Sequence, residues 1–332
     1  MTSRYVSVHQ NPKGPGDSRP TAIDIVKDEG LQGKLVDKVA LITGCSSGLG
    51  IETARALNVT GMKLFLGVRD IGKGQAALSD ILEPGRVQLL KMDLNSLDSM
   101  RATAAEFLEK SKTLNILINN AGIMATPQGK TADGFELQFG TCHLAHFLLF
   151  QLLKPTLLAS STPGCNSRVV SLSSSGHRAG GIRVDDYNFE KGDYTPWAGY
   201  GQAKTANIYF ANEVDRRYGP QGLHGLSVMP GGIMTGLQTH VPDAVKDRWS
   251  SDETMKNYMK SPEQGAATTV YAALSRDWEG KGGKYLEDCA EAELCQASGS
   301  TSGGYAPHAY DEQAEKRLWI DSLRFVGIGD DK

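Results

Sequence analysis

The feature that most limits the fold of this 332-residue chain is a regular alternation that begins near Lys38. Short apolar runs alternate with longer amphipathic stretches of helical length. Short buried strands that alternate with helices are typical of βαβ units, in which helices cover both faces of a parallel sheet. We therefore expect a single-domain α/β fold with a Rossmann-type, doubly wound parallel sheet. The expected strands are Val39–Thr43, Lys63–Val68, Val87–Met92, Leu114–Ile118, Arg168–Leu172 and Leu223–Met229.

The helices expected between these strands are Gly48–Val59, Ile71–Leu82, Ser96–Lys110, Asp133–Leu158 and Ala198–Arg217. The fourth should break or end near Pro155, because proline removes a backbone donor. Its apolar part, Leu144–Leu158, is interrupted by polar residues and is too short for a bilayer. We expect a buried helix there and no membrane span.

The segments outside the alternation differ in character. Residues 1–20 are rich in Pro and Gly and predict a disordered tail. Residues 21–36 form an N-terminal extension, in which Thr21–Gly30 predicts a short amphipathic helix that docks on the domain. Residues 37–297 should form the Rossmann-fold domain. Residues 298–332 should contain a flexible loop over 298–304 and a final helix around Glu312–Phe325.

The composition excludes several classes of function. A net charge of −3, with 40% hydrophobic and 22% charged residues, gives no electrostatic footprint for nucleic acid or an anionic membrane. The five cysteines have no paired or zinc-like spacing, so we expect free thiols in a reducing compartment and no metal site. No secretory signal pattern opens the sequence, and the cytoplasm is the expected location.

A glycine-rich turn follows the first expected strand. Glycines let the backbone turn sharply and approach a pyrophosphate, and the N-terminus of the following helix favours anions. Glycine-rich turns are common, but this one lies between a strand and a helix at the start of a βαβ run, which is the context of a dinucleotide site. The candidate residues are Gly44, Ser46, Ser47, Gly48, Leu49 and Gly50.

The end of the second strand indicates which nicotinamide cofactor is bound. Enzymes that use NAD place Asp or Glu there to hold the ribose hydroxyl, whereas this chain has Arg69, with Lys73 nearby. A guanidinium suits a 2′-phosphate, and Ser46 and Ser47 could add donors, so we expect NADP(H). Asp70 argues weakly against this assignment. The alternative is that Arg69 and Lys73 are ordinary surface charges.

Tyr200 and Lys204 are the candidate catalytic pair. Residues four apart share a helix face, so the Lys204 ammonium should lie near the Tyr200 phenol. A free phenol has a pKa of about 10, and a nearby ammonium and an oxidised nicotinamide ring both favour the phenolate. Tyr200 could then exchange a proton with an alcohol or carbonyl as hydride moves to or from the cofactor. A Tyr-x3-Lys pair without the upstream turn would usually be a solvated helix face.

The Gly-x3-Gly-x-Gly turn preceded by Thr, together with Tyr-x3-Lys, resembles the short-chain dehydrogenase/reductase family over roughly residues 36–290. Three further segments match the family in order: Asp93, Asn119-Asn120-Ala121-Gly122, and Pro230-Gly231 followed by Thr235. The resemblance implies that Asp93 contacts the adenine, that Asn120 belongs to the cofactor site, and that Gly231, Ile233 and Thr235 lie beneath the nicotinamide. Relatives often form a homodimer through the helices that here carry Leu144–Leu157 and Ile208–Val214, although a C-terminal extension can block this.

The resemblance also implies a catalytic serine at the end of the fifth strand. The segment reads Val169-Val170-Ser171-Leu172-Ser173-Ser174-Ser175-Gly176. The match assigns Ser174 to polarise the substrate oxygen, while Ser173 faces away or caps the strand. The run of serines leaves a shift of one position open.

Several segments resemble the retinol-dehydrogenase-like branch, which acts on bulky hydrophobic carbonyls and alcohols. They are the long insertion between Ser174 and Tyr200, Asp133-Gly134-Phe135-Glu136, His143-Leu144-Ala145-His146-Phe147 and Pro262-Glu263-Gln264-Gly265-Ala266. Tyr194 and Trp197 in the insertion would wall a substrate pocket or simply pack in the core. An apolar lid is expected around residues 232–260.

Cys142 stands where the branch usually has Asn, which is thought to hold a water that links the Lys to solvent. Cysteine is a weak hydrogen-bond donor. Either Thr141 or His143 supplies the relay, or proton exchange is slowed. We interpret His143 and His146 as hydrogen-bonded helix histidines rather than bases.

The leading hypothesis is an NADP(H)-dependent reductase or dehydrogenase for a bulky hydrophobic or secondary-metabolite carbonyl or alcohol, with reduction as the physiological direction. The alternative is a redox-sensing module that binds NADP(H) with weak or lost catalysis. Only Cys142 favours that alternative.

Overall fold

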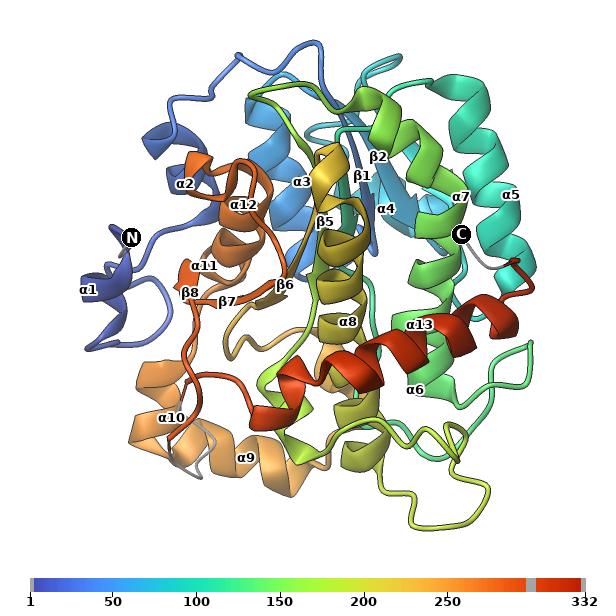
Figure 1. Ribbon diagram of the computed structural model, residues 1–332. Coiled ribbons are helices and arrows are strands. Elements are labelled where there is room, and N and C mark those ends of the chain that lie inside the picture. Colours follow the sequence, from blue (N-terminus) through green and yellow to red (C-terminus); the bar gives the residue numbers. More distant parts are fainter. Residues whose placement is uncertain (1–2, 297–302, 330–332) are drawn as a thin grey trace.

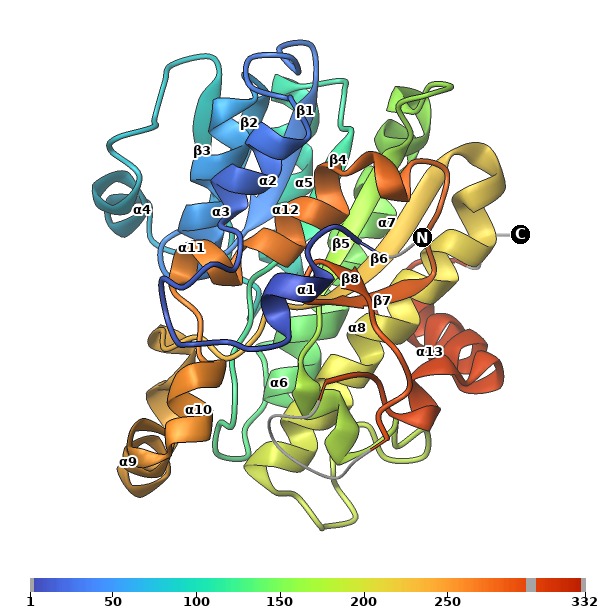
Figure 2. The same ribbon diagram turned by 90° about the vertical axis from the view of Figure 1, so that its left-hand side faces the viewer.

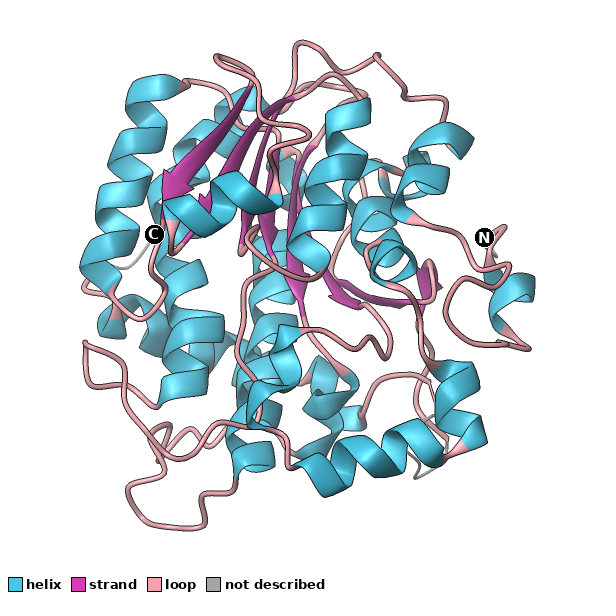
Figure 3. Cartoon of the chain, turned by 180° about the vertical axis from the view of Figure 1, so that it is seen from behind, coloured by secondary structure: helices cyan, strands magenta, loops and turns pink. Residues whose placement is uncertain are grey.

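The computed structural model describes residues 3–296 and 303–329. Its centre is an eight-stranded sheet with the order β3-β2-β1-β4-β5-β6-β7-β8 (Figures 1 and 3). Every neighbouring pair is parallel except β7 and β8. The strands are β1 (Val39–Thr43), β2 (Lys63–Val68), β3 (Val87–Lys91), β4 (Ile116–Asn119), β5 (Ser167–Leu172), β6 (Leu223–Met229), β7 (Lys284–Glu287) and β8 (Ala290–Glu291). The strand order reverses between β1 and β4, where ligands bind in open α/β sheets.

Helices cover both faces of the sheet, as the alternation predicts. One face packs against α2 (Ala22–Asp28), α3 (Leu49–Val59) and α12 (Ala267–Leu274). The other packs against α5 (Leu97–Lys110), α7 (Ala145–Ser160) and α8 (Pro196–Tyr218). The central strands β1, β4, β5 and β6 are buried almost throughout, which explains their continuous apolar runs. The Rossmann-type, single-domain α/β prediction is confirmed.

Some boundaries differ from the expected ones. The helix after β2 is α4 (Ile71–Ala77), which ends before the expected Leu82. The strands β7 and β8 were not expected, because each is too short to show a pattern. The helices α9 (Asp243–Ser251) and α10 (Glu253–Tyr258) follow β6 and occupy the region expected to form a lid, and α11 (Pro262–Gly265) follows directly after it.

The prediction that the fourth helix starts at Asp133 and breaks or ends near Pro155 is wrong. It begins as α6 (Leu137–Phe139), where the Glu136 carboxylate accepts from the backbone N–H groups of Gln138 and Phe139. It then passes through a π-turn, Gly140–Leu144, into α7, which contains Pro155. Burial of this helix against α5 and the sheet outweighs the one missing backbone bond.

The stretch Leu137–Ser160 is long and apolar enough to cross a membrane by length and composition alone. It is the one such helix in the part of the chain that the structure describes. However, 67% of its most apolar window is buried inside the protein. It therefore has the position of a core helix.

The prediction of a disordered tail over residues 1–20 is wrong for the described residues 3–20. They form a short helix, α1 (Val6–His9), and a loop that lies along one side of the domain (Figure 2). Tyr5 is buried, and its hydroxyl donates to Asp28 at 2.9 Å. The helix expected within Thr21–Gly30 is confirmed as α2, which Thr21 and Asp24 cap reciprocally.

The C-terminal helix α13 (Glu312–Phe325) matches the expected bounds and crosses over α8 (Figure 1). Its Trp319 packs against Phe147 and Phe150 of α7 and stacks on Phe210 of α8. The C-terminal helix thus covers aromatic side chains on the two helices through which relatives are expected to pair. Most of the predicted flexible loop, residues 298–302, lies outside the described residues.

Candidate functional site

A cavity of about 620 Å³ opens where the parallel strands end at their carboxyl edge. This size lies within the range of small-molecule and cofactor sites. It gathers most of the predicted site residues from segments far apart in the sequence. Those that line it are Gly44, Ser46, Ser47, Gly48, Leu49, Asn120, Ser174, Tyr200, Lys204, Gly231, Ile233 and Thr235.

The glycine turn between β1 and α3 fits a group that must approach the backbone closely. Gly44 and Gly48 have φ values of 73° and 60°, which favour glycine. A Cβ on Gly50 would lie 2.2 Å from the Gly44 carbonyl oxygen, so Gly50 lets α3 start directly against the turn. The first turn of α3 then presents backbone N–H groups without intrahelical partners beside the cavity, an arrangement suited to a phosphate.

Asn120 and Thr43 hold this turn in place. The Asn120 amide donates to the Thr43 carbonyl oxygen at 2.7 Å. The Thr43 hydroxyl accepts from the backbone N–H groups of Asn120 and Ala121 at 3.0 and 2.9 Å. These bonds connect the carboxyl ends of β1 and β4 at the point where the strand order reverses. Asn120 thus lines the cavity and also fixes the glycine turn.

Four predicted cofactor residues lie outside the cavity lining, namely Gly50 in the first turn of α3 and the residues Arg69, Lys73 and Asp93. Arg69 and Lys73 are exposed at the turn between β2 and α4. Asp93 follows β3 and is half-buried, and its carboxylate accepts from the Asn95 backbone N–H at 3.0 Å. The carboxylate of Asp70 caps α4 by accepting from the Lys73 backbone N–H at 3.0 Å. Asp70 therefore has a structural function that does not involve a ribose.

Tyr200 and Lys204 lie on the first turns of α8 and face the cavity. The helix starts at Pro196, after Thr195 caps it by accepting from the Ala198 backbone N–H. Both side chains are buried, with exposed fractions of 3% and 4%. The Lys204 Nζ lies 5.5 Å from the Tyr200 ring centroid and donates to the Leu172 carbonyl oxygen at 3.0 Å. The end of β5 therefore holds the ammonium beside the phenol.

The two serines at the end of β5 point in different directions. Ser173 is buried, and its hydroxyl donates to the Lys204 carbonyl oxygen at 2.8 Å, which ties β5 to α8. Ser174 is only half-buried and lines the cavity, where its side chain hydrogen-bonds with Tyr200. Of the two serines between which the sequence left a choice, Ser174 therefore directs its hydroxyl to Tyr200, and Ser173 directs its hydroxyl to the backbone of Lys204.

The electrostatic surroundings of Tyr200 differ from the sequence expectation. Burial raises the pKa of the Tyr200 phenol above its ordinary value, and this is the largest effect. The Lys204 ammonium and the hydrogen bond with Ser174 act in the opposite direction, toward the phenolate. Because burial prevails, these surroundings favour the protonated phenol.

Cys142 lies in the π-turn, close to Lys204. Its thiol contacts the Ile123 backbone, at 3.5 Å from the N–H and 3.6 Å from the carbonyl oxygen. A Cβ on Gly122 would lie 3.4 Å from both the Cys142 sulfur and the Lys204 Nζ. Cys142 is completely buried, and burial raises the pKa of its thiol. The side chain therefore remains a neutral thiol.

His143 and His146 are satisfied by hydrogen bonds, as expected. His143 Nε2 pairs with the Ser322 hydroxyl of α13 at 2.9 Å, so it points away from Lys204 and cannot supply the relay there. His146 bridges the Cys142 carbonyl oxygen and the Thr43 hydroxyl, at 3.0 and 2.9 Å. Burial lowers the pKa values of His143 and His146 to about 3 and about 4, which keeps both rings neutral.

One wall of the cavity is apolar and is formed by residues of the lid. Its residues Leu237, Trp249, Met255, Tyr258 and Met259 line the cavity, together with Met124 and Trp197. Trp197 lies at the mouth and is 40% exposed. Tyr194, by contrast, packs on Phe189 and donates to the Thr126 carbonyl oxygen, so it supports the insertion rather than lining the cavity.

Gly176 and Arg178 are among the cavity residues that were not assigned a role from the sequence. A Cβ on Gly176 would lie 2.7 Å from the Tyr200 ring, so this glycine lets the segment after β5 pack against the phenol. Arg178 brings a cation to a largely apolar wall. Gly176 follows the serine run and could have been noticed there, whereas nothing local marks Arg178. Within residues 3–296 and 303–329, no group of three His, Cys, Asp or Glu side chains could hold a metal ion.

Comparison with solved structures shows the same fold in other proteins. An uncharacterized protein from Mycobacterium paratuberculosis matches with a TM-score of 0.70 and 30% identity, over 95% of this chain and all of that one. The Pseudomonas aeruginosa RhlG/NADP active-site complex matches with a TM-score of 0.60 and 23% identity, over 75% of this chain and 94% of that one.

Comparison with known sequences gives the family. The profile described as short chain dehydrogenase matches residues 38–246. The short-chain dehydrogenase/reductase prx1 of Penicillium roqueforti is 53% identical over 98% of this chain and 96% of its own length. Oxidoreductase calI of Penicillium decumbens is 43% identical over 98% of each chain. Retinol dehydrogenase 12 of Mus musculus is 37% identical over 88% of this chain and 87% of its own length. The chain belongs to the short-chain dehydrogenase/reductase family and has retinol dehydrogenases among its relatives.

Proposed function

We propose that this protein is an NADP(H)-dependent oxidoreductase that interconverts a carbonyl and an alcohol, with Tyr200 as the general acid or base. The observation that carries the proposal is the placement of Ser174, Tyr200 and Lys204 in one cavity with the glycine turn. A bound nicotinamide would supply or accept the hydride. The positive φ values of Gly44 and Gly48 and the close approach of Gly50 fit the dinucleotide to this turn.

The residues of the chain divide the work between them. The Ser174 hydroxyl would donate a hydrogen bond to the substrate oxygen and polarise it. The Tyr200 phenol would deliver its proton to that oxygen during reduction. The Lys204 ammonium would stabilise the phenolate that remains. Because a cytoplasm is rich in NADPH, reduction is the proposed physiological direction.

The preference for NADP(H) rests on Arg69 and its surroundings. Arg69 directly follows β2 and has no ion pair with any described side chain, so its guanidinium is available to a 2′-phosphate. Lys73 and the cavity-lining Ser46 and Ser47 would add donors. Asp70 does not compete for the ribose, because its carboxylate caps α4. Asp93, Asn120, Gly231, Ile233 and Thr235 would complete the cofactor site.

The apolar wall of the cavity supports a bulky hydrophobic substrate. The two fungal relatives and the retinol dehydrogenases are oxidoreductases by name, and we propose a secondary-metabolite or lipid-derived carbonyl for this chain. We also propose a cytoplasmic location. A homodimer through α7 and α8 would require α13 to leave the aromatic side chains that it covers.

The redox-sensing alternative is not favoured by the surroundings of Cys142. A reactive cysteine needs a low pKa and access to solvent. Cys142 has neither, because it is completely buried and its pKa is raised. Its contacts with the Ile123 backbone suit a packing residue of the π-turn.

The test of the proposed function is a set of turnover assays with NADPH and a panel of bulky carbonyls at several pH values. We expect carbonyl reduction to be constant through neutral pH and to fall only as the pH rises through the raised pKa of Tyr200, because the donor is the protonated phenol. Oxidation of the product alcohol needs the phenolate, so it should increase with pH, beginning at a lower pH than the fall in reduction because the oxidised nicotinamide ring favours the phenolate. Tight NADPH binding without turnover of any carbonyl would contradict the proposal and favour a binding module.

We expect Cys142→Asn to retain or raise turnover. The Asn amide can donate and accept toward the Ile123 backbone, where the thiol makes only long contacts of 3.5 and 3.6 Å. A better-ordered π-turn beside Lys204 should make proton exchange equal or faster, and steady-state kcat measures this. A complete loss of turnover in a folded Cys142→Asn protein would show that the cysteine itself is needed.

A further inference from the structure

The segment expected to be a disordered tail instead reaches the base of the substrate lid. From α1 the chain runs toward α10 and α11 (Figure 2). The Gly14 backbone N–H donates to the Asn257 carbonyl oxygen at 3.0 Å. Gly14 and Gly16 both have positive φ values, so the glycines that suggested disorder serve tight turns. The contact joins residues far apart in the sequence.

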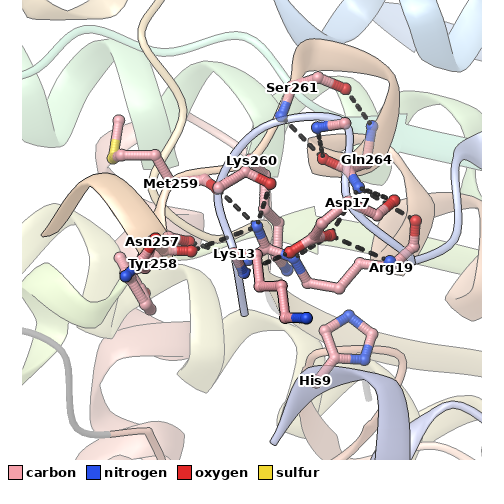
Figure 4. A network of polar contacts seen from close by, with 12 residues as sticks. His9, Lys13, Asp17, Arg19, Asn257, Tyr258, Met259, Lys260, Ser261 and Gln264 are labelled. Carbon is pink, nitrogen blue, oxygen red and sulfur yellow. Dashed lines mark hydrogen bonds and ion pairs between the residues drawn. The ribbon is translucent and has the colours of Figure 1, made fainter. Parts of the chain in front are cut away.

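Arg19 is the centre of this contact (Figure 4). It is only 4% exposed, and its guanidinium donates to the carbonyl oxygens of Tyr258 and Met259 at 2.9 and 2.6 Å. It also donates to the Asp17 carboxylate at 2.8 Å. The last carbonyls of a helix have no intrahelical partners, and a cation there also complements the helix dipole. Arg19 therefore supplies, from another segment, the partners that the end of α10 lacks.

Gln264 fastens the same segment to the start of α11. Its Nε2 donates to the Arg19 carbonyl oxygen at 3.0 Å and to the Asp17 carboxylate at 3.1 Å. Its Oε1 accepts from the backbone N–H groups of Gly16 and Ser261 at 2.9 and 3.1 Å. Both ends of the amide are thus used, and α10 and α11 are held to one short loop.

The residues that Arg19 holds belong to the wall of the cavity. Tyr258 and Met259 line it, and the next residue, Lys260, contacts the turn after β6. The Lys260 backbone N–H donates to the Gly232 carbonyl oxygen at 2.8 Å, and a Cβ on Gly231 would lie 2.8 Å from the Lys260 side chain. Arg19 is therefore connected through a few bonds to the lid and to the turn that carries Gly231.

We propose that Arg19 is a positioning residue that holds the substrate lid in place against the cavity, with Asp17 and Gln264 as its supports. The N-terminal segment thus packs behind the residues that line the substrate cavity and supports them. The lid role stands on geometry alone, whereas its effect on catalysis rests on the proposed function.

The test compares Arg19→Met with Arg4→Met in the full-length protein. Methionine keeps much of the side-chain volume and removes the guanidinium. Arg4 lies on the same segment but is exposed and donates to residues at the end of α2 instead of to the lid. Hydrogen–deuterium exchange of residues 236–259 should become about tenfold faster in Arg19→Met and stay unchanged in Arg4→Met. The KM for the carbonyl should rise about tenfold, with a smaller change in kcat.

Equal lid exchange in the two variants would overturn the proposal, whatever the activities are. If lid exchange is faster in Arg19→Met but the wild-type protein reduces no carbonyl, the lid role of Arg19 stands and the proposed function is wrong. If Arg19→Met does not fold, Asp17→Asn serves in its place, because it weakens the hold on Arg19 but keeps the guanidinium. It should give a smaller increase in lid exchange, and an unchanged lid there would likewise overturn the proposal.

Discussion

Replacing Tyr200 by Phe is expected to lower kcat by about 10³-fold or more, which is within the range for loss of a positioned acid or base. The variant removes one oxygen atom and keeps the ring between Gly176 and the Lys204 ammonium. NADPH binding should therefore change little, and its fluorescence in a titration measures this. The single-turnover rate at saturating NADPH and carbonyl then isolates the loss to the chemical step.

The matched control is Tyr209→Phe, on the same helix. The Tyr209 hydroxyl donates to the His308 carbonyl oxygen at 2.6 Å, on the side of α8 that faces the C-terminal segment. Its loss should cost about 1 kcal/mol of stability and leave kcat unchanged. Similar kcat values for Tyr200→Phe and wild type would show that another group transfers the proton.

The sequence was sufficient for most of the strands. The strands β1, β2 and β6 have the expected bounds, because their apolar runs are limited by turn residues. The helix through Pro155 was misjudged because its apolar packing against α5 and the sheet is a tertiary effect. The segment 3–20 was misjudged for the same reason, since the partners of Arg19 come from residues 257–259. No local pattern contains either fact.

In the candidate site, too, local motifs could be predicted from the sequence and tertiary effects could not. Residues that belong to contiguous motifs, such as Gly44–Gly50 or Tyr200 and Lys204, could be picked from spacing because their chemistry depends on near neighbours. The choice between Ser173 and Ser174 needed the direction of each side chain. The raised pKa of Tyr200 depends on how many atoms surround the phenol, and Lys204 alone suggested the opposite direction.

The second large effect concerns the cofactor. Arg69→Asp should lower kcat/KM with NADPH by about 100-fold, because the loss of two charge-assisted hydrogen bonds to a phosphate costs roughly 3 kcal/mol. The new carboxylate would also repel the phosphate and could accept from a ribose hydroxyl, so kcat/KM with NADH should rise. The measured quantity is the ratio of the two kcat/KM values for one carbonyl.

Arg86→Asp is the matched control for this change. Arg86 precedes β3, at the amino end of the strands, whereas Arg69 follows the neighbouring strand β2 at the carboxyl end. Arg86 pairs with Glu83 on the surface. Arg86→Asp changes the net charge of the protein by the same amount as Arg69→Asp. A shift in cofactor preference that came from the net charge alone would therefore occur in both variants. A shift only in Arg69→Asp places the 2′-phosphate at the end of β2. An unchanged ratio in Arg69→Asp would make Arg69 an ordinary surface charge and remove the NADP(H) preference from the proposed function, while the roles of Ser174, Tyr200 and Lys204 would stand.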